Sequence, residues 1–189
     1  MICTPAFQRV LFDSSAIITF VEAGGIYQLR TYIGAKGAIT IDAEKELLRK
    51  SQNDIPGLIA LSRLGWPPGE PLSLPPHLAQ EAADMRRVEM KPGEHPDAHL
   101  GEVSTALMTQ HLGNAVAVME DEFGKRICAR RNIPRISTAL LCAEMVAASA
   151  LDEDDGFAVY DLATPDRVGR TQFTEAVAKA RDALRSPES

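Results

Sequence analysis

The sequence has few cysteines, and they form no motif. Cys3, Cys128 and Cys142 are scattered over 189 residues, and none belongs to a CxxC pair. An odd number of isolated cysteines argues against a disulfide framework or a zinc ribbon, and it suits free thiols in a reducing compartment. We therefore expect a cytoplasmic protein.

Long apolar segments are also missing. No uncharged apolar run approaches the length of a membrane span. Arg9 and Asp13 interrupt the N-terminal region before the apolar stretch of a signal peptide can form. These absences predict a chain that neither enters a membrane nor carries an export signal.

The sequence has no excess of positive charge. It contains 20 Lys and Arg residues against 26 Asp and Glu residues, which gives a net charge of -6. This balance disfavours nucleic-acid binding through bulk charge, but it allows an enzyme whose acids hold a cation and whose basic residues form a local patch. The GxGxxG and GxxxxGK[ST] motifs are absent too, so a nucleotide- or phosphate-binding α/β enzyme has little support.

The sequence does contain an alternation of short apolar runs and helical patterns. The chain is 45% hydrophobic and long enough for one domain with a substantial core. Apolar runs predict strands at residues 10–12, 38–41, 115–119 and 134–137. Helical spacing predicts helices at 17–30, 42–50, 55–64, 78–90, 99–112, 123–131 and 139–151. The first is broken at Gly24-Gly25, Asp42 caps the second, and Thr138 caps the last. This order predicts an α/β fold, a three-layer α/β/α sandwich with a central parallel sheet.

We expect this sandwich to occupy residues 1–151, followed by a C-terminal extension at 152–189. The proline- and glycine-rich stretch at 65–76 is typical of a loop, either an insertion or a flexible cover. In the extension, residues 152–156 form an acidic turn and the apolar run 157–160 fits an edge strand. An amphipathic helix beginning at Thr171 ends the chain.

Four acids fall at related places in this predicted sheet. Asp13 follows the first strand and Asp121 follows the third, while Glu46 lies on the helix after the second strand and Glu102 in the first turn of a later helix. The carboxyl ends of parallel strands line the ligand crevice, so all four acids can face it. Converging carboxylates repel one another, and a hard divalent cation such as Mg²⁺ or Mn²⁺ relieves that repulsion. Such a cation lowers the pKa of a bound water and neutralises charge on a phosphodiester.

Each acid also has a simpler interpretation or a rival. Asp13 can cap the following helix, although the presence of the other three acids favours a ligand role and leaves Ser14 and Ser15 as the expected caps. The alternative role of Glu102 is a favourable interaction of its carboxylate with the N-terminus of the helix. The neighbouring acids that compete for the predicted roles are Asp42 and Glu44 for Glu46, Asp97 for Glu102, and Glu120 and Glu122 for Asp121.

The order and spacing of these segments resemble the PIN-domain nucleases, in the branch close to toxin nucleases. The resemblance runs from Val10 to about Leu141 and is carried by residues 11–15, 38–41 with 46–47, 100–102, and 119–122 with Arg126. It implies a metal-dependent endoribonuclease in which Asp13, Glu46, Glu102 and Asp121 hold Mg²⁺ or Mn²⁺. It also implies an RNA substrate and an antitoxin protein as partner, and it is compatible with a homodimer.

The sequence leaves a second function open. A PIN-like module that has lost catalysis and binds a protein or RNA would keep the same fold, and Ser104 and Thr105 stand where acids often follow the Gly-Glu pair. Several other residues have two interpretations each. Ser15, Ser137 and Thr138 can orient a water or phosphate or only cap helices, and Arg126, with Lys125, Arg130, Arg131 and Arg135, can meet RNA phosphates or pair with carboxylates. The stretch from His95 to His99 fits a loop with incidental histidines.

Overall fold

The computed structural model describes residues 4–51, 65–67, 69–89, 93, 99–164 and 169–185. The helix predicted at 55–64, the rival ligand Asp97, and Cys3 and His95 lie outside these residues. None of the described helices is both long and apolar enough to cross a bilayer.

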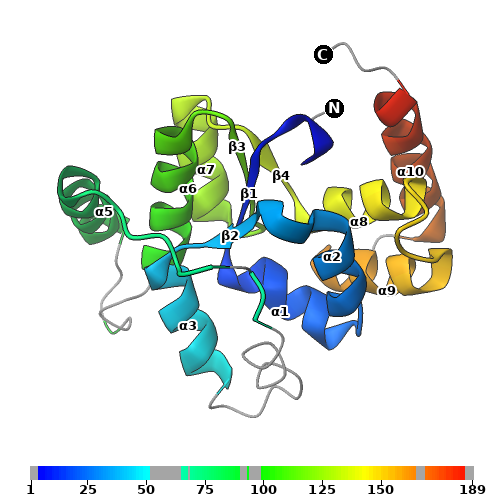
Figure 1. Cartoon of the computed structure of the whole chain (residues 1–189), viewed down its shortest axis with the longest axis horizontal. Coiled ribbons are helices and arrows are strands. Elements are labelled where there is room, and N and C mark those ends of the chain that lie inside the picture. Colours follow the sequence, from blue (N-terminus) through cyan, green and yellow to red (C-terminus); the bar gives the residue numbers. More distant parts are fainter. Residues whose placement is uncertain are drawn as a thin grey trace.

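A parallel sheet of four strands lies at the centre of the described chain (Figure 1). The strands β1 (Arg9–Phe12), β2 (Gly37–Ile39), β3 (Ala115–Val118) and β4 (Arg135–Ile136) are arranged in the order β2-β1-β3-β4. β3 is buried along its whole length, which explains its unbroken apolar sequence, since a parallel sheet is covered on both faces. The four predicted strands are therefore confirmed: β1 and β2 begin one residue earlier than predicted, and β2, β3 and β4 end earlier.

Helices cover both faces of this sheet, as the three-layer prediction required. Their bounds are α1 Ser14–Glu22, α2 Ile26–Ile33, α3 Ile41–Ser51, α5 Pro76–Glu89, α6 Leu100–Leu112, α7 Glu122–Arg131, α8 Thr138–Ala147, α9 Glu153–Ala163 and α10 Arg170–Arg185. Figure 1 shows α5, α6 and α7 on one side and α1, α2, α8, α9 and α10 on the other. Short 3-10 helices occupy Thr4–Ala6 and Gly34–Lys36.

Strand alternation divides the core between the two faces. Phe12 and Val118 point into the larger apolar cluster, which also contains residues of α1, α2, α8, α9 and α10. Ala117 belongs to the cluster formed with α5, α6 and α7. Successive strand residues face opposite sides of a sheet, so a short apolar run supplies both layers at once.

The predicted edge strand at 157–160 is wrong, because these residues lie within α9. Asp152 caps this helix by accepting a hydrogen bond from the Asp155 amide at 2.9 Å. Three acids fill the first turn, where the helix dipole favours negative charge. Tyr160 then packs against Phe173 of α10, their ring centroids 5.2 Å apart, in the same core cluster as Phe12.

Two predicted caps are also displaced by one or two residues. Ser137 caps α8 in place of Thr138, since its Oγ accepts from the Leu140 amide at 3.1 Å. α3 begins at Ile41, and Thr40 Oγ1 accepts from the Ala43 amide at 3.3 Å, the role predicted for Asp42. Each cap thus lies directly at the end of its strand.

The proline-rich stretch is bonded to the sheet through its described residues. Trp66 is 6% exposed, and its ring centroid lies 5.2 Å from that of Phe12. Its Nε1 donates to the Gly34 carbonyl at 3.3 Å. Further on, the Leu72 amide donates to the Ile39 carbonyl at 2.8 Å, so backbone pairing continues beyond β2.

Replacing Trp66 with Ala removes an indole from the core, and we expect this change to lower the free energy of unfolding by about 3–5 kcal/mol. Tyr27→Ala is the control, because Tyr27 is 58% exposed and its loss empties no cavity. Urea unfolding followed by circular dichroism measures both variants. Equal losses in the two variants would contradict the placement of Trp66 in the core.

Candidate metal centre

Asp13 is both a helix cap and a member of an acidic cluster. Its Oδ2 accepts hydrogen bonds from the Ser15 amide at 3.4 Å and from Ser15 Oγ at 2.5 Å, so it caps α1. The expectation that Ser14 and Ser15 are the caps is therefore wrong. The two interpretations of Asp13 are compatible because the second oxygen, Oδ1, is buried and has no hydrogen-bond partner.

Glu46 and Glu102 bring two further buried oxygens to Asp13. One carboxylate oxygen of each of the three residues lies within 4.8 Å of the others. Glu46 Oε2 and Glu102 Oε2 are buried and, like Asp13 Oδ1, have no hydrogen-bond partner. The other oxygen of Glu46, Oε1, pairs with Lys50 Nζ at 3.1 Å. Asp42, a sequence rival of Glu46, faces Lys45 at 4.0 Å and belongs to neither cluster of ligand atoms found among the described residues.

Asp121 also lies close to Glu102, and it caps α7. Its Oδ1 accepts from the amides of Phe123 at 2.7 Å and Gly124 at 3.4 Å. Its sequence rivals are occupied elsewhere. Glu120 accepts from the Ala139 amide at 3.3 Å, and Glu122 pairs with Lys125 at 2.9 Å on the surface.

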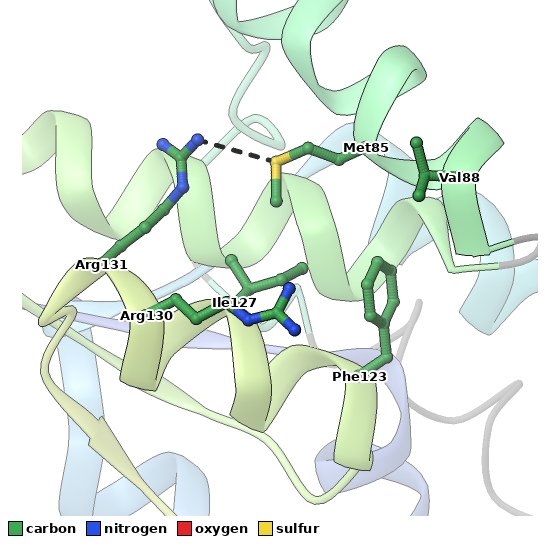
Figure 2. A pocket seen from close by; sticks show the side chains of 6 residues that line it. All are labelled: Met85, Val88, Phe123, Ile127, Arg130 and Arg131. Carbon is green, nitrogen blue, oxygen red and sulfur yellow. Dashed lines mark hydrogen bonds between the residues drawn. The ribbon is translucent and has the colours of Figure 1, made fainter.

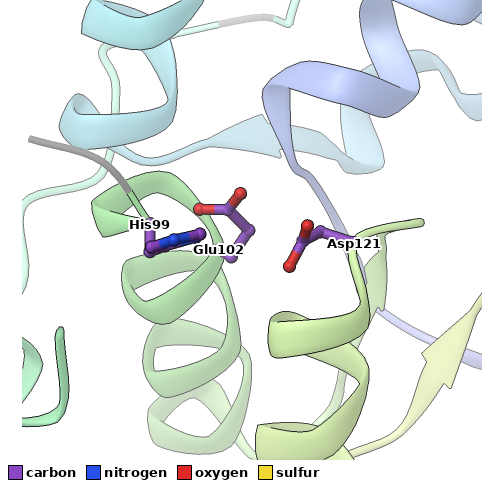
Figure 3. A group of neighbouring side chains, drawn as sticks. All are labelled: His99, Glu102 and Asp121. Carbon is purple, nitrogen blue, oxygen red and sulfur yellow. The ribbon is translucent and has the colours of Figure 1, made fainter. Parts of the chain in front are cut away.

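His99 joins Glu102 and Asp121 in a second group, and the sequence interpretation missed it. One ligand atom of each residue lies within 4.8 Å of the others (Figure 3). His99 caps the backbone of α6 in a left-handed conformation, φ 65°, and its ring packs edge-on to Phe123 at a centroid distance of 5.3 Å. A sequence signal existed, since positions three apart at a helix start share a face. The prolines before His99 concealed it.

Two glycines make room for the carboxylates. A Cβ on Gly101 would lie 2.5 Å from Glu46 Oε2 and 3.3 Å from Asp13 Oδ1. A Cβ on Gly124 would lie 2.6 Å from Met119 Sδ and 3.3 Å from Glu102 Cβ. The Gly-Glu pair at the start of α6 therefore has a steric cause: the residue before Glu102 must be small because the other acids point at it.

Burial and mutual repulsion act on the ionisation of the cluster. Burial raises the pKa of Asp13 to about 6; Glu46 adds to the increase, and the Ser15 hydrogen bond and Lys50 oppose it. Burial raises the pKa of Glu102 to about 8, with further contributions from Asp13, Glu46 and Asp121. The cluster thus contains more negative charge than its surroundings neutralise.

The residues present fit a hard divalent cation. Three buried carboxylate oxygens lack a partner, a glycine keeps the space between them open, and oxygen donors are the ligands that Mg²⁺ and Mn²⁺ accept. Two of the acids, Asp13 and Asp121, follow the adjacent strands β1 and β3. Between these two strands lies the switch point of the sheet, because β2 is added on one side of β1 and β3 on the other. Open α/β sheets bind their ligands at such a position.

The other predicted site residues occupy different places. Ser15 contacts the cluster through Asp13. Ser137 caps α8 and Thr138 is its first residue, and Glu120 accepts a hydrogen bond from the amide of the next residue, Ala139. Arg126 is exposed on α7, with its guanidinium 5.6 Å from the centre of the Phe123 ring.

The basic residues of α7 and β4 are partly engaged within the protein. Lys125 pairs with Glu120 and Glu122, Arg131 with Glu81 and Gln110, and Arg135 donates to the Met119 carbonyl at 3.5 Å. Arg130 lines a pocket of about 180 Å³ between α5 and α7 (Figure 2). Phe123 lines this pocket and also contacts His99, so the pocket adjoins the second group of ligand atoms.

The fold and this site define an α/β protein with a carboxylate cluster suited to a divalent cation at the switch point of its sheet. No family model, curated protein or solved structure matches the chain. The case for a function therefore depends on the residues and their geometry.

Gly101→Ala tests the space between the acids without removing any ligand. The added methyl group would point at Glu46 Oε2 and Asp13 Oδ1. We expect Mn²⁺ affinity, measured by isothermal titration calorimetry, to fall at least about tenfold, comparable with the loss of a residue that supports a metal ligand. Glycine to alanine in a helix interior ordinarily favours folding by about 1 kcal/mol, so unchanged Mn²⁺ binding with higher stability would contradict the proposed steric role.

Glu102→Gln tests the electrostatic cost of the cluster. Because the pKa of Glu102 is raised from its ordinary value of 4.5 to about 8, its contribution to stability is present below pH 4.5 and is lost as the pH rises to 8. The side chain of Gln stays neutral at every pH. In EDTA we therefore expect the free energy of unfolding of the variant, relative to that of wild type, to be about 2 kcal/mol higher at pH 8 than at pH 5. Thermal melts should show this as a shift of roughly 5 °C.

At pH 8, excess Mn²⁺ should make wild type more stable than Glu102→Gln, because the wild-type cluster would bind the cation and the variant has lost a carboxylate. A melting-temperature difference that does not change with pH would contradict this account.

Proposed function

We propose that this chain is a metal-dependent endoribonuclease that hydrolyses RNA phosphodiester bonds with Mg²⁺ or Mn²⁺ and has a PIN-like arrangement of its acids. One observation carries the proposal: Asp13, Glu46 and Glu102 come from three separate elements and converge with unpartnered buried oxygens. Such convergence is costly unless a cation is bound there. A structural role alone would favour pairing or neutral side chains.

The order of the acids along the chain supports the PIN-like assignment. The resemblance names four acids, and the structure brings Asp13, Glu46 and Glu102 together, with Asp121 next to Glu102. The choice of RNA as substrate rests on this resemblance. The parallel sheet and the position of the acids at its carboxyl end are compatible with it.

The cation, when bound, would supply a water of lowered pKa and neutralise charge on the phosphodiester. The chain's own groups would hold and orient its ligands. Ser15 fixes Asp13 Oδ2, which leaves Oδ1 to face the other acids. Lys50 holds Glu46 Oε1 at 3.1 Å and so directs Oε2 to the same point.

Exposed basic residues lie along α7, the helix that Asp121 caps. Arg126 and Arg130 are exposed, and Asp121 caps the same helix. Phosphate contacts by such residues position an RNA backbone without reading its sequence, which suits a chain whose net charge is -6. We assign RNA-phosphate contact to these two arginines.

The proposal extends to the setting of the enzyme. A cytoplasmic chain would meet its RNA directly, and the toxin-like resemblance adds an antitoxin protein as partner and a homodimer as its assembly. Binding of an antitoxin would then control access to the acids.

Cleavage of a labelled single-stranded RNA tests the proposed activity. With Mn²⁺ or Mg²⁺ we expect wild type to cut and Asp13→Asn and Asp121→Asn to lose about 100-fold or more, since even residues that only support metal ligands cost 10–100-fold. Glu122→Gln is the matched control, because Glu122 adjoins Asp121 in sequence but pairs with Lys125 on the surface.

Equal cleavage by wild type and both Asn variants would contradict the proposal. Binding of RNA with Mn²⁺ but no cleavage by wild type would assign the chain to the non-catalytic modules.

A further inference from the structure

The ligand atoms of the site form two overlapping groups. The first contains Asp13, Glu46 and Glu102, and the second contains His99, Glu102 and Asp121. Only Glu102 belongs to both. The first group is all carboxylate, whereas the second includes an imidazole.

We propose that His99, Glu102 and Asp121 form a second divalent-cation subsite, which takes Mn²⁺ in preference to Mg²⁺. The proposal rests on the proposed function, because it adds a second cation to the same centre through the shared Glu102. It goes further by assigning His99 a ligand role and the subsite a metal preference.

Glu102 is the residue that the two groups share. It is 8% exposed, and its Oε2 is buried without a hydrogen-bond partner. A carboxylate offers two oxygens and can therefore contact two cations at once. Because Glu102 has a ligand atom close to Asp13 and Glu46 and one close to His99 and Asp121, it is placed to bridge two cations.

The spacing of the second group suits one cation. Two atoms bound to the same cation at about 2.1 Å are at most about 4.2 Å apart. The three ligand atoms lie within 4.8 Å of one another, so small side-chain rotations bring them to bonding distance. Figure 3 shows His99 and Glu102 at the start of α6 and Asp121 at the start of α7, with the three side chains lying between these two helix ends.

The surroundings restrain these side chains. Asp121 Oδ1 accepts two amide hydrogen bonds of the α7 N-terminus, at 2.7 and 3.4 Å, which fixes the carboxylate. The His99 ring packs edge-on to Phe123, which is itself 6% exposed. Restrained ligands lose less conformational entropy when a cation binds.

The chemistry of the donors sets the metal preference. Mg²⁺ strongly favours oxygen ligands, and imidazole binds transition metals better. Mn²⁺ accepts oxygen donors as Mg²⁺ does, and although it is the weakest binder among the divalent first-row transition metals, it accepts an imidazole ligand more readily than Mg²⁺. The subsite with His99 should therefore discriminate between the two ions, and the subsite of three carboxylates should do so less.

Electron spin-echo spectroscopy of the full chain loaded with Mn²⁺ tests this assignment, because it detects a nitrogen ligand directly. We expect wild type to show nitrogen modulation and His99→Asn to lose it. Asn tolerates the left-handed backbone at this position better than other non-glycine residues. His111→Asn is the matched control, since His111 is exposed in the last turn of the same helix.

Calorimetry gives the stoichiometry and the preference. We expect wild type to bind about two Mn²⁺ ions, and His99→Asn to bind about one or to weaken one of two sites at least tenfold. Mg²⁺ should displace the ion at the carboxylate subsite more readily than the one at His99. Circular dichroism confirms that each variant is folded.

The outcomes separate the two proposals. Binding of Mn²⁺ that depends on Asp13, without nitrogen modulation in wild type, overturns the His99 subsite and leaves the nuclease proposal standing. Nitrogen modulation that depends on His99, in a chain that does not cut RNA, supports the subsite as a binding site and overturns the nuclease. A wild-type chain that binds no Mn²⁺ overturns both.

Discussion

The burial of like charges at the end of β1 is the constraint on which the rest of the site depends. Asp13 and Glu102 are 1% and 8% exposed, and one oxygen of each is buried without a partner. Removing charged groups from water has a high free-energy cost. In a cluster without a bound cation, the repulsion between the carboxylates raises this cost further. Neighbouring structure limits that cost: Ser15 and Lys50 each bind one of the carboxylates, and Gly101 leaves the space that the acids need.

The same local device recurs where strands pass into helices. Asp13 and Asp121 each follow a strand and cap the next helix, and Glu120 accepts a hydrogen bond at the start of α8. A capping carboxylate is stabilised by amide hydrogen bonds and by the helix dipole. Since a cap uses one oxygen of Asp13, the helix start fixes the side chain and the other oxygen faces the cluster.

Much of the fold and most of the cluster could be predicted, because strand ends in a parallel sheet meet at one edge and the acids there stand out in the sequence. One miss has a local cause, and two depend on tertiary contacts. Residues 157–160 form a short apolar run that suits strand or helix equally, and the capping role of Asp152 decides for helix. Trp66 enters the core through contacts with Phe12 that no local pattern reveals. The helix predicted at 99–112 already begins at His99, but His99 and Asp121 come together only in the tertiary structure.

Lys50 neutralises only part of the negative charge of the acidic cluster. Its ammonium group contacts one oxygen of Glu46 at 3.1 Å and lies 3.4 Å from Ser14 Oγ, so it offsets part of the negative charge. One ammonium group does not balance three carboxylates, and the pKa of Glu102 stays raised to about 8 in its presence. Complete neutralisation by the protein would remove the attraction for a divalent ion, whereas no neutralisation would make the metal-free fold costly. Under the proposed function, partial compensation would let the chain fold without the ion and still bind it, and cation binding would then be coupled to stability through the same buried oxygens.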